Sequence, residues 1–416
     1  MSANFENTHS NRAFAKPKTF FWHFRPVAVM YMLIGIMPLK NILHCDSTLL
    51  RFSVFSYQFI YSLIIFIVTI IGMVNFRDPL YLIQEAINFR NNYVWRYMVV
   101  LLVVLRSILS YYFCTTKSRK LVKLIQILEL FDYKKSKAFK GTAWEASRRL
   151  LVWTILPILS GITLASSLAV LFMQFTKITF YNGKQTFNQQ HIFVGMIGAW
   201  QMTPILLYNY FAFVIFYNFH DIKKTALNHI PIKALHKDKN ICIPPDFKMI
   251  LLNLNQMYFL MGDAVKYLGK MFGWYLAVDQ FYIIVMFVLN LYIYFFTENI
   301  KDQNLLFCII INAFLNFIVI NVSHKITEEA NNIVEFMQKL PPLILDGEDK
   351  SEIQLILSQI LSSSVQVSAG GFFNINRQRI PAVLSSIATY LIVLVQFTKQ
   401  GIYNNNQNET KSLLIN

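Results

Sequence analysis

Seven long segments of this chain are apolar and carry almost no charge. Each has, or nearly has, the roughly 20 residues that an α-helix needs to cross the hydrocarbon core of a bilayer. The segments are 53–73, 94–113, 150–173, 192–217, 272–296, 305–322 and 381–397. The sequence therefore predicts an all-α polytopic membrane protein with seven transmembrane helices.

Composition and charge agree with this expectation. Hydrophobic residues make up 55% of the 416 residues and charged residues only 14%, against roughly 25% charged residues in soluble domains. The formal net charge of +16 would suit nucleic acid or anionic lipid. Because the basic residues cluster in loops between spans, orientation in the membrane explains them better, and we expect no nucleic-acid partner.

Two basic loops indicate which way the spans run. Residues 114–149 hold ten Lys or Arg against three Asp or Glu, and residues 218–271 hold eight against four. Basic loops stay in the cytoplasm, so seven spans place the N-terminus inside and the C-terminus outside the plasma membrane. An eighth apolar stretch, 26–43, is interrupted by Pro38 and Lys40. We expect it to be a re-entrant or interfacial helix; the alternative is an eighth span.

Three segments beside the spans alternate apolar and polar residues at helical spacing: 117–130, 244–270 and 351–361. They predict membrane helices that extend into the cytoplasm and an anchor helix before the last span; the alternative is surface helices lying on lipid. The N-terminal part is expected to comprise a cytoplasmic N-terminus with the interfacial helix at 1–52 and four spans at 53–217, with the basic loop 114–149. A cytoplasmic helical extension at 218–271 and two spans at 272–324 are expected to follow. The C-terminal part then holds cytoplasmic anchor helices at 325–380, the last span at 381–397 and an extracellular tail at 398–416.

The last span has an unusual ending. Thr389 and Tyr390 are followed by five aliphatic residues and then by Gln396 and Phe397. A glutamine within an apolar helix needs hydrogen-bond partners or water, and the axis of an oligomer supplies both. This pattern resembles the C-terminal signature of insect gustatory receptors. Segments 33–39, 117–124 and 370–376 resemble further stretches of the same family.

The resemblance implies a fold and an activity. The family is similar to insect odorant receptors, whose subunits assemble as tetramers around a pore lined by the last helix and act as ligand-gated cation channels. The implied partners are a small-molecule tastant, membrane lipid, the cations Na⁺, K⁺ and Ca²⁺, and related subunits in a homotetramer or heterotetramer, with no cofactor. Leu391 stands where sugar receptors usually carry Glu, which counts against the sugar branch.

Four residues of the last span are candidates for the pore. Tyr390, Val393 and Phe397 are spaced i, i+3 and i+7 on one helix face, with Gln396 beside them. Rings of Val393 and Phe397 around an axis would gate by dewetting, and Gln396 would add a polar ring. Alternatively, Tyr390 and Gln396 bond neighbouring helices of one subunit.

Charged and polar residues within spans are further candidates. Arg106 and Asp279 lie at similar depth in the second and fifth spans and are expected to form a structural ion pair, unless Arg106 snorkels to the headgroups. A ligand pocket is expected in the outer halves of the spans, and ordinary interface aromatics are the alternative. Its candidate residues are Arg96, Gln174, Trp200, Gln201, Tyr294 and Asn312.

Other motifs separate the possible functions. Asn408 begins a glycosylation acceptor in the expected extracellular tail.

Catalytic and metal-binding patterns are missing, so we expect no enzyme. A seven-helix G-protein-coupled receptor would need the opposite orientation, and a secondary transporter would show broken helices and repeats. These two classes remain the alternatives to a tastant-gated, non-selective cation channel.

Overall fold

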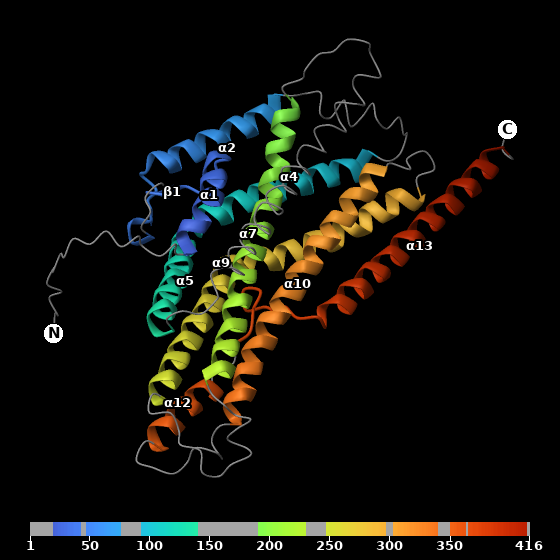
Figure 1. Ribbon diagram of the computed structural model, residues 1–416. Helices are drawn as coiled ribbons and strands as arrows, with labels where there is room; N and C mark the ends of the chain where they lie inside the picture. Colours follow the sequence, from blue (N-terminus) through green and yellow to red (C-terminus); the bar gives the residue numbers. More distant parts are fainter. Residues whose placement is uncertain are drawn as a thin grey trace.

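Long helices build the molecule, seen here in a computed structural model that describes residues 20–42, 47–75, 93–139, 190–229, 247–296, 303–339, 350–362 and 365–413. Figure 1 shows them as one elongated bundle. The elements are α1 (Phe20–Leu33), β1 (Leu39–Lys40), the short 3₁₀ helix η1 (Ser47–Leu49), β2 (Arg51–Phe52), α2 (Tyr57–Asn75), α4 (Tyr93–Thr116), α5 (Ser118–Ala138), α7 (Gln190–His229), α9 (Phe247–Phe296), α10 (Gln303–Gln338), α12 (Lys350–Ser362) and α13 (Arg379–Leu413).

Six of the seven expected spans fall on these helices, namely on α2, α4, α7, α9, α10 and α13. The third, at 150–173, lies outside the described residues. Within the described ranges, four helices contain stretches long and apolar enough to cross a membrane: Trp200–His229, Phe247–Leu289, Ile310–Gln338 and Arg379–Gln396. Shorter apolar stretches lie at Phe24–Leu33, Tyr57–Ile71 and Leu101–Thr116.

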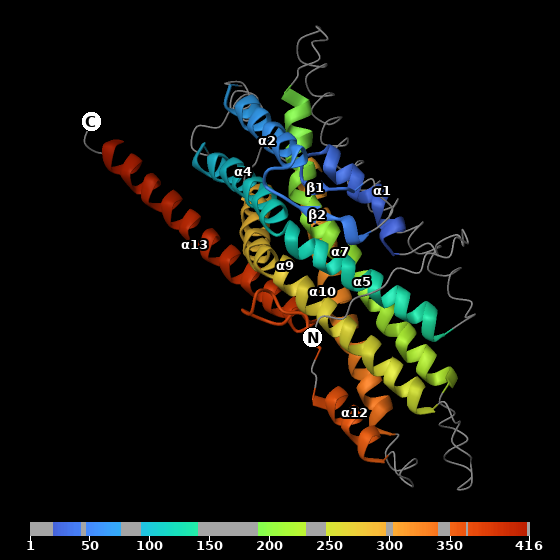
Figure 2. The same cartoon turned by 90° about the vertical axis from the view of Figure 1, so that its left-hand side faces the viewer.

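Three helices continue far beyond the length of a membrane span. α7, α9 and α10 have 40, 50 and 36 residues, whereas roughly 20 suffice to cross the hydrocarbon core. Their extensions pack with α5 and α12 at one end of the bundle, as both views show (Figures 1 and 2). The amphipathic segments found in the sequence therefore lie on these extensions, on α5 and on α12. Ile356 and Ile360 of α12 join the same core as the apolar face of α5, whereas Leu355 and Leu361 are exposed.

α7 is the central helix. It contacts α2, α4, α9 and α10, and 78% of its most apolar stretch is buried. A helix that is apolar on all sides favours such an interior position. Its Tyr210 and Phe211 pack against Phe20 and Phe24 of α1.

The N-terminal helix differs from the expectation of one helix over 26–43. α1 begins at Phe20 and ends at Leu33, and the chain then forms a turn and the antiparallel pair β1–β2. Gly35 has a φ of +80°, which favours glycine. Pro38 disfavours helical backbone in the residue before it and offers no N–H. The helix therefore stops before the apolar sequence does.

A tight hairpin connects the core to the last helix. The backbone N–H of Ala369 donates to the carbonyl of Phe373, with the two atoms 2.8 Å apart, and Ile375 donates to Val367 at 2.9 Å. Gly370 and Gly371 turn the chain with φ values of +63° and +89°. We call residues 365–376 the hairpin. It lies against α9, where Trp274 and Phe372 make an edge-to-face contact.

α13 lies along one side of the bundle, and its C-terminal end projects away from it (Figures 1 and 2). Only 6% of its stretch Arg379–Gln396 is buried. The helix continues through Leu413, so residues 398–413 of the expected tail extend the helix that carries the last expected span. Hydropathy falls after Phe397, but no proline follows to stop the helix.

Candidate functional site

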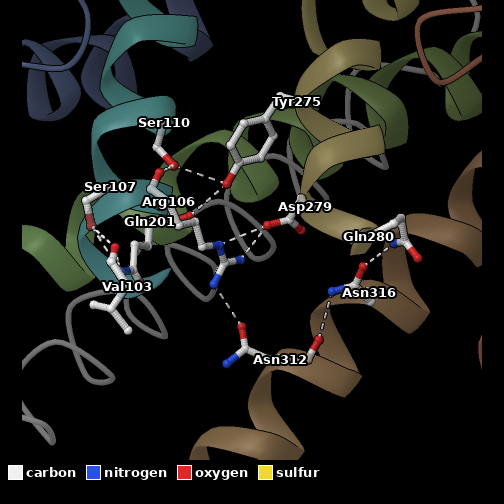
Figure 3. Close-up of polar contacts among 10 residues, drawn as sticks. All are labelled: Val103, Arg106, Ser107, Ser110, Gln201, Tyr275, Asp279, Gln280, Asn312 and Asn316. Carbon is white, nitrogen blue, oxygen red and sulfur yellow. Dashed lines mark hydrogen bonds and ion pairs between the residues drawn. The ribbon is translucent and has the colours of Figure 1, made fainter. Parts of the chain in front are cut away.

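A buried ion pair lies at the centre of a polar cluster in the bundle (Figure 3). Nη2 of Arg106 on α4 lies 2.8 Å from Oδ1 of Asp279 on α9, and the two side chains are only 4% and 1% exposed. Nε of Arg106 donates to the same oxygen at 2.9 Å. Buried opposite charges in a low-dielectric interior persist only when paired and hydrogen-bonded, so this contact fixes α4 against α9.

Arg106 also holds a third helix. Its Nη1 donates to Oδ1 of Asn312 on α10 at 3.3 Å. The guanidinium carbon lies 4.5 Å from the ring centroid of Tyr282, a cation–π contact. Asn312 is linked in turn to Asn316, whose Nδ2 donates to the Asn312 carbonyl at 3.0 Å. One arginine thus joins α4, α9 and α10.

The cluster reaches α7 through Tyr275 and Gln201. The Tyr275 hydroxyl donates to the carbonyl of Gln201 at 3.2 Å, and Oγ of Ser110 lies 3.2 Å from that hydroxyl. Nε2 of Gln201 donates to the Val103 carbonyl at 2.8 Å and to Oγ of Ser107 at 3.0 Å. The four helices are therefore joined through one network of buried polar side chains. Within the described residues, Oδ2 of Asp279 accepts no hydrogen bond in this network.

Trp200 belongs to a separate aromatic cluster next to this one. Its ring centroid lies 5.6 Å from those of Phe66 on α2 and Tyr111 on α4. Its indole N–H donates to the carbonyl of Ile34 at 3.3 Å. Trp200 is 1% exposed, so it packs the turn after α1 against α2, α4 and α7.

The expected ligand residues are placed as follows. Trp200, Gln201 and Asn312 use their polar groups within the bundle. Arg96 and Tyr294 lie on α4 and α9, but their side chains are outside the described part of the structure, as is all of Gln174.

Sequence reasoning missed Tyr275, Ser110 and Tyr282. Helical spacing was the available signal, because Tyr275 lies four residues before Asp279 and Ser110 four residues after Arg106.

A cavity of about 220 Å³ lies elsewhere, between α10 and the chain around the hairpin. Its lining is mainly polar and includes none of the expected ligand residues. The lining residues are His324, Thr327, Gln366, Val367, Asn374, Ile375, Asn376, Arg377 and Gln378. Pockets for drug-sized ligands have roughly 300–1,000 Å³, so this cavity is small for a ligand site.

The expected pore residues are on the uncovered part of α13. Tyr390 and Val393 are 58% and 38% exposed, and Gln396 is exposed. Phe397 and Asn408 lie on the same helix, but their side chains are outside the description. Across the described ranges, no group of three His, Cys, Asp or Glu side chains is arranged to hold a metal ion.

Long apolar helices around a buried ion pair define a multi-pass helical membrane protein. The profile of the family described as 7tm chemosensory receptor matches residues 24–401, and the chain therefore belongs to this family of receptors, which are not enzymes. The all-α membrane fold and the chemosensory class expected from the sequence are thereby confirmed.

Two solved structures have a similar fold. The structure of the insect olfactory receptor OR5 from Machilis hrabei aligns with a TM-score of 0.61 and 14% identity, covering 91% of this chain and 99% of that chain. The same receptor in complex with eugenol aligns with a TM-score of 0.57 and 17% identity, again covering 91% and 99%. At such identities the likeness is one of fold.

Proposed function

We propose that this chain is a gustatory receptor of the plasma membrane that acts as a tastant-gated, non-selective cation channel. Its membership of the chemosensory family supports the receptor class. The ending Thr389-Tyr390, five aliphatic residues and Gln396-Phe397 supports the gustatory branch. The pore is lined by α13.

The uncovered surface of α13 carries this proposal. Only 6% of the apolar stretch of α13 is buried, against 78% for that of α7. Apolar side chains can face lipid at no cost, but the exposed Gln396 cannot without losing its hydrogen bonds. An axis between subunits offers Gln396 water and neighbouring copies of itself. Val393 and Phe397 then close the axis as hydrophobic rings, and Tyr390 lies about one turn before Val393 on the same face.

The subunit assembles as a homotetramer or as a heterotetramer with related subunits. Seven helices cross the membrane, with 150–173 as the third. The N-terminus and the packed extensions of α7, α9 and α10 with α5 and α12 are cytoplasmic and anchor the subunits together. The basic excess of 114–149 and 218–271 supports this orientation. The C-terminal part of α13 is extracellular.

The ligand is a small organic tastant bound among the outer halves of the spans. A receptor of the same fold has been solved with eugenol, a small organic ligand. The proposed contacts are Arg96, Gln174, Trp200, Gln201, Tyr294 and Asn312. A ligand that bonds Asn312 competes with its bond to Arg106. Binding would thereby shift the bundle toward a state with different helix contacts, which is how a ligand moves a conformational equilibrium.

Current recordings test the proposal. Cells expressing the chain, alone or with related subunits, should pass a cation current when a panel of sugars and bitter compounds is applied. Phe397→Ala widens the apolar neck and should raise the current without ligand. Phe55→Ala, at a residue that is 95% exposed just before α2, is a control that should leave the basal current unchanged. Unaltered basal current in Phe397→Ala at normal surface expression would contradict a gate at this position.

A further inference from the structure

Three lysines gather where two helices leave the apolar part of the bundle. Lys117 follows directly after the end of α4, and Lys120 lies in the first turn of α5. Lys270 of α9 comes two residues before Phe272, where the fifth expected span begins. Nζ of Lys120 donates to the backbone carbonyl of Lys270 at 3.2 Å. The contact brings charges that are 150 residues apart in sequence to one boundary of the membrane.

These charges are not neutralised by described carboxylates. Among the described residues, neither Lys117, Lys120 nor Lys270 forms an ion pair with Asp or Glu. The pKa of Lys120 lies below its ordinary value, first because the ammonium is partly desolvated and then because Lys117 and Lys270 add positive charge beside it. Three close cations that no described carboxylate pairs with repel one another, so an anion bound among them relieves that repulsion.

We propose that Lys117, Lys120 and Lys270 bind the headgroup of an anionic lipid that carries more than one phosphate, the chemistry of a phosphoinositide. A phosphomonoester brings close to two negative charges and three acceptor oxygens, which suits three ammonium donors. Basic residues at the ends of transmembrane helices recognise such headgroups. The site lies on the side assigned to the cytoplasm, and it does not depend on channel activity.

The position of Lys270 gives this site a structural consequence. Lys270 stands between two glycines of α9, Gly269 directly before it and Gly273 three residues after it. Both glycines face the hairpin that leads into α13. A Cβ on Gly269, for example, would stand 3.2 Å from the carbonyl oxygen of Ser368. A headgroup held between α5 and α9 therefore ties these helices together at the level of the hairpin.

Lipid binding to the purified full-length chain tests the proposal. In detergent micelles, a fluorescent short-chain phosphatidylinositol bisphosphate should bind saturably. Lys117→Gln, Lys120→Gln and Lys270→Gln together should weaken binding by about 100-fold, because each basic residue near an anionic surface contributes a factor of about five. The same three changes to Arg should keep binding. If the triple Gln variant elutes as an aggregate, the single variant Lys120→Gln tests the proposal instead, and its affinity for the fluorescent lipid should fall about fivefold.

A matched control removes the same charge elsewhere. Lys137, Lys224 and Lys339 are exposed lysines at the far end of α5, α7 and α10, and their joint change to Gln should leave binding unaltered. An equal loss in this control would show binding to overall charge and overturn the site.

Competition distinguishes the source of the phosphate. Unlabelled phosphatidylinositol bisphosphate should displace the probe, whereas soluble inositol trisphosphate should need a far higher concentration because it lacks acyl chains. Phosphatidylserine at equal total charge should compete poorly. If inositol trisphosphate displaced the probe as effectively as the lipid does, the site would bind a soluble phosphate rather than a lipid. If phosphatidylserine displaced it as effectively, the site would not require a headgroup with more than one phosphate.

Discussion

Gly273 of α9 lies directly against Gly370 of the hairpin. A Cβ on Gly273 would stand 2.2 Å from the backbone nitrogen of Gly370 and 2.9 Å from the carbonyl oxygen of Ser368. Backbone therefore meets backbone, and any side chain at Gly273 would force the hairpin away from α9. Because the hairpin leads directly into α13, this contact determines where the last helix begins.

Gly273→Ala should therefore destabilise the protein. Overpacking of a well-packed contact costs about 1–3 kcal/mol, which thermal unfolding in detergent, followed by size exclusion, will report as a lower melting temperature. Gly198→Ala on α7 is the control, since no described atom outside its own helix turn lies within 4 Å of its Cβ position. The control should equal the unmodified chain or exceed it, because Ala is the better helix former by about 1 kcal/mol. Equal stability of the two variants would contradict the close contact.

Arg106 and Asp279 should depend on each other. Asp279→Asn or Arg106→Gln leaves a buried charge without its partner, at about 3–5 kcal/mol, and should lower both melting temperature and surface expression. Exchanging the two residues should recover part of the loss. Glu335→Gln, which breaks an exposed pair with Lys339, should change neither quantity. A charge-exchanged variant no better than the single changes would show that the pairing itself is unimportant.

Substitutions of Trp200 should affect the stability of the protein more than they affect its response to the ligand. Trp200→Phe retains the ring contacts with Phe66 and Tyr111 but removes the donor to Ile34, for a net loss of about 1 kcal/mol. Trp200→Ala should cost about 3–5 kcal/mol. Melting temperatures and agonist dose–response curves will separate the two roles. Loss of the agonist response in Trp200→Phe at normal stability would instead make Trp200 a ligand contact.

The C-terminal end of α13 should carry a glycan. Asn408→Gln should abolish a gel shift that is sensitive to glycosidase, whereas Asn405→Gln, outside the acceptor sequence, should retain it. An N-terminal tag should be inaccessible to antibody on intact cells. A tag labelled without permeabilisation would reverse the proposed orientation and favour a G-protein-coupled type of receptor.

Hydropathy was sufficient to place six apolar helices, which the structure has as α2, α4, α7, α9, α10 and α13. It also drew attention to Arg106 and Asp279, because a charge within an apolar helix needs a partner. Tyr275, Ser110 and Gln201 are different: uncharged polar residues suit many helix interfaces, and only the packing shows which groups they meet. For the same reason Asn312, expected as a ligand contact, was not linked to Arg106.

The ends of helices and the contacts between backbone segments could not be predicted from the hydropathy pattern, because tertiary structure sets them. The apolar stretch 26–43 continues through Gly35 and Pro38, although the helix α1 has already ended at Leu33. α13 shows the opposite, since the helix outlasts its apolar residues and continues through Leu413. The contact of Gly273 with Gly370 joins residues 97 positions apart (370 − 273), and nothing in the local sequence of either indicates the other.

The most direct test of a pore lined by α13 is the reversal potential of the agonist-evoked current in Gln396→Glu. In a tetramer this change places four carboxylates around one axis, and a ring of acids favours cations. The permeability to Ca²⁺ relative to Na⁺ should therefore rise, while Gln359→Glu on the exposed face of α12 should leave it unaltered. An unchanged permeability ratio in Gln396→Glu, with normal surface expression and agonist response, would contradict the pore.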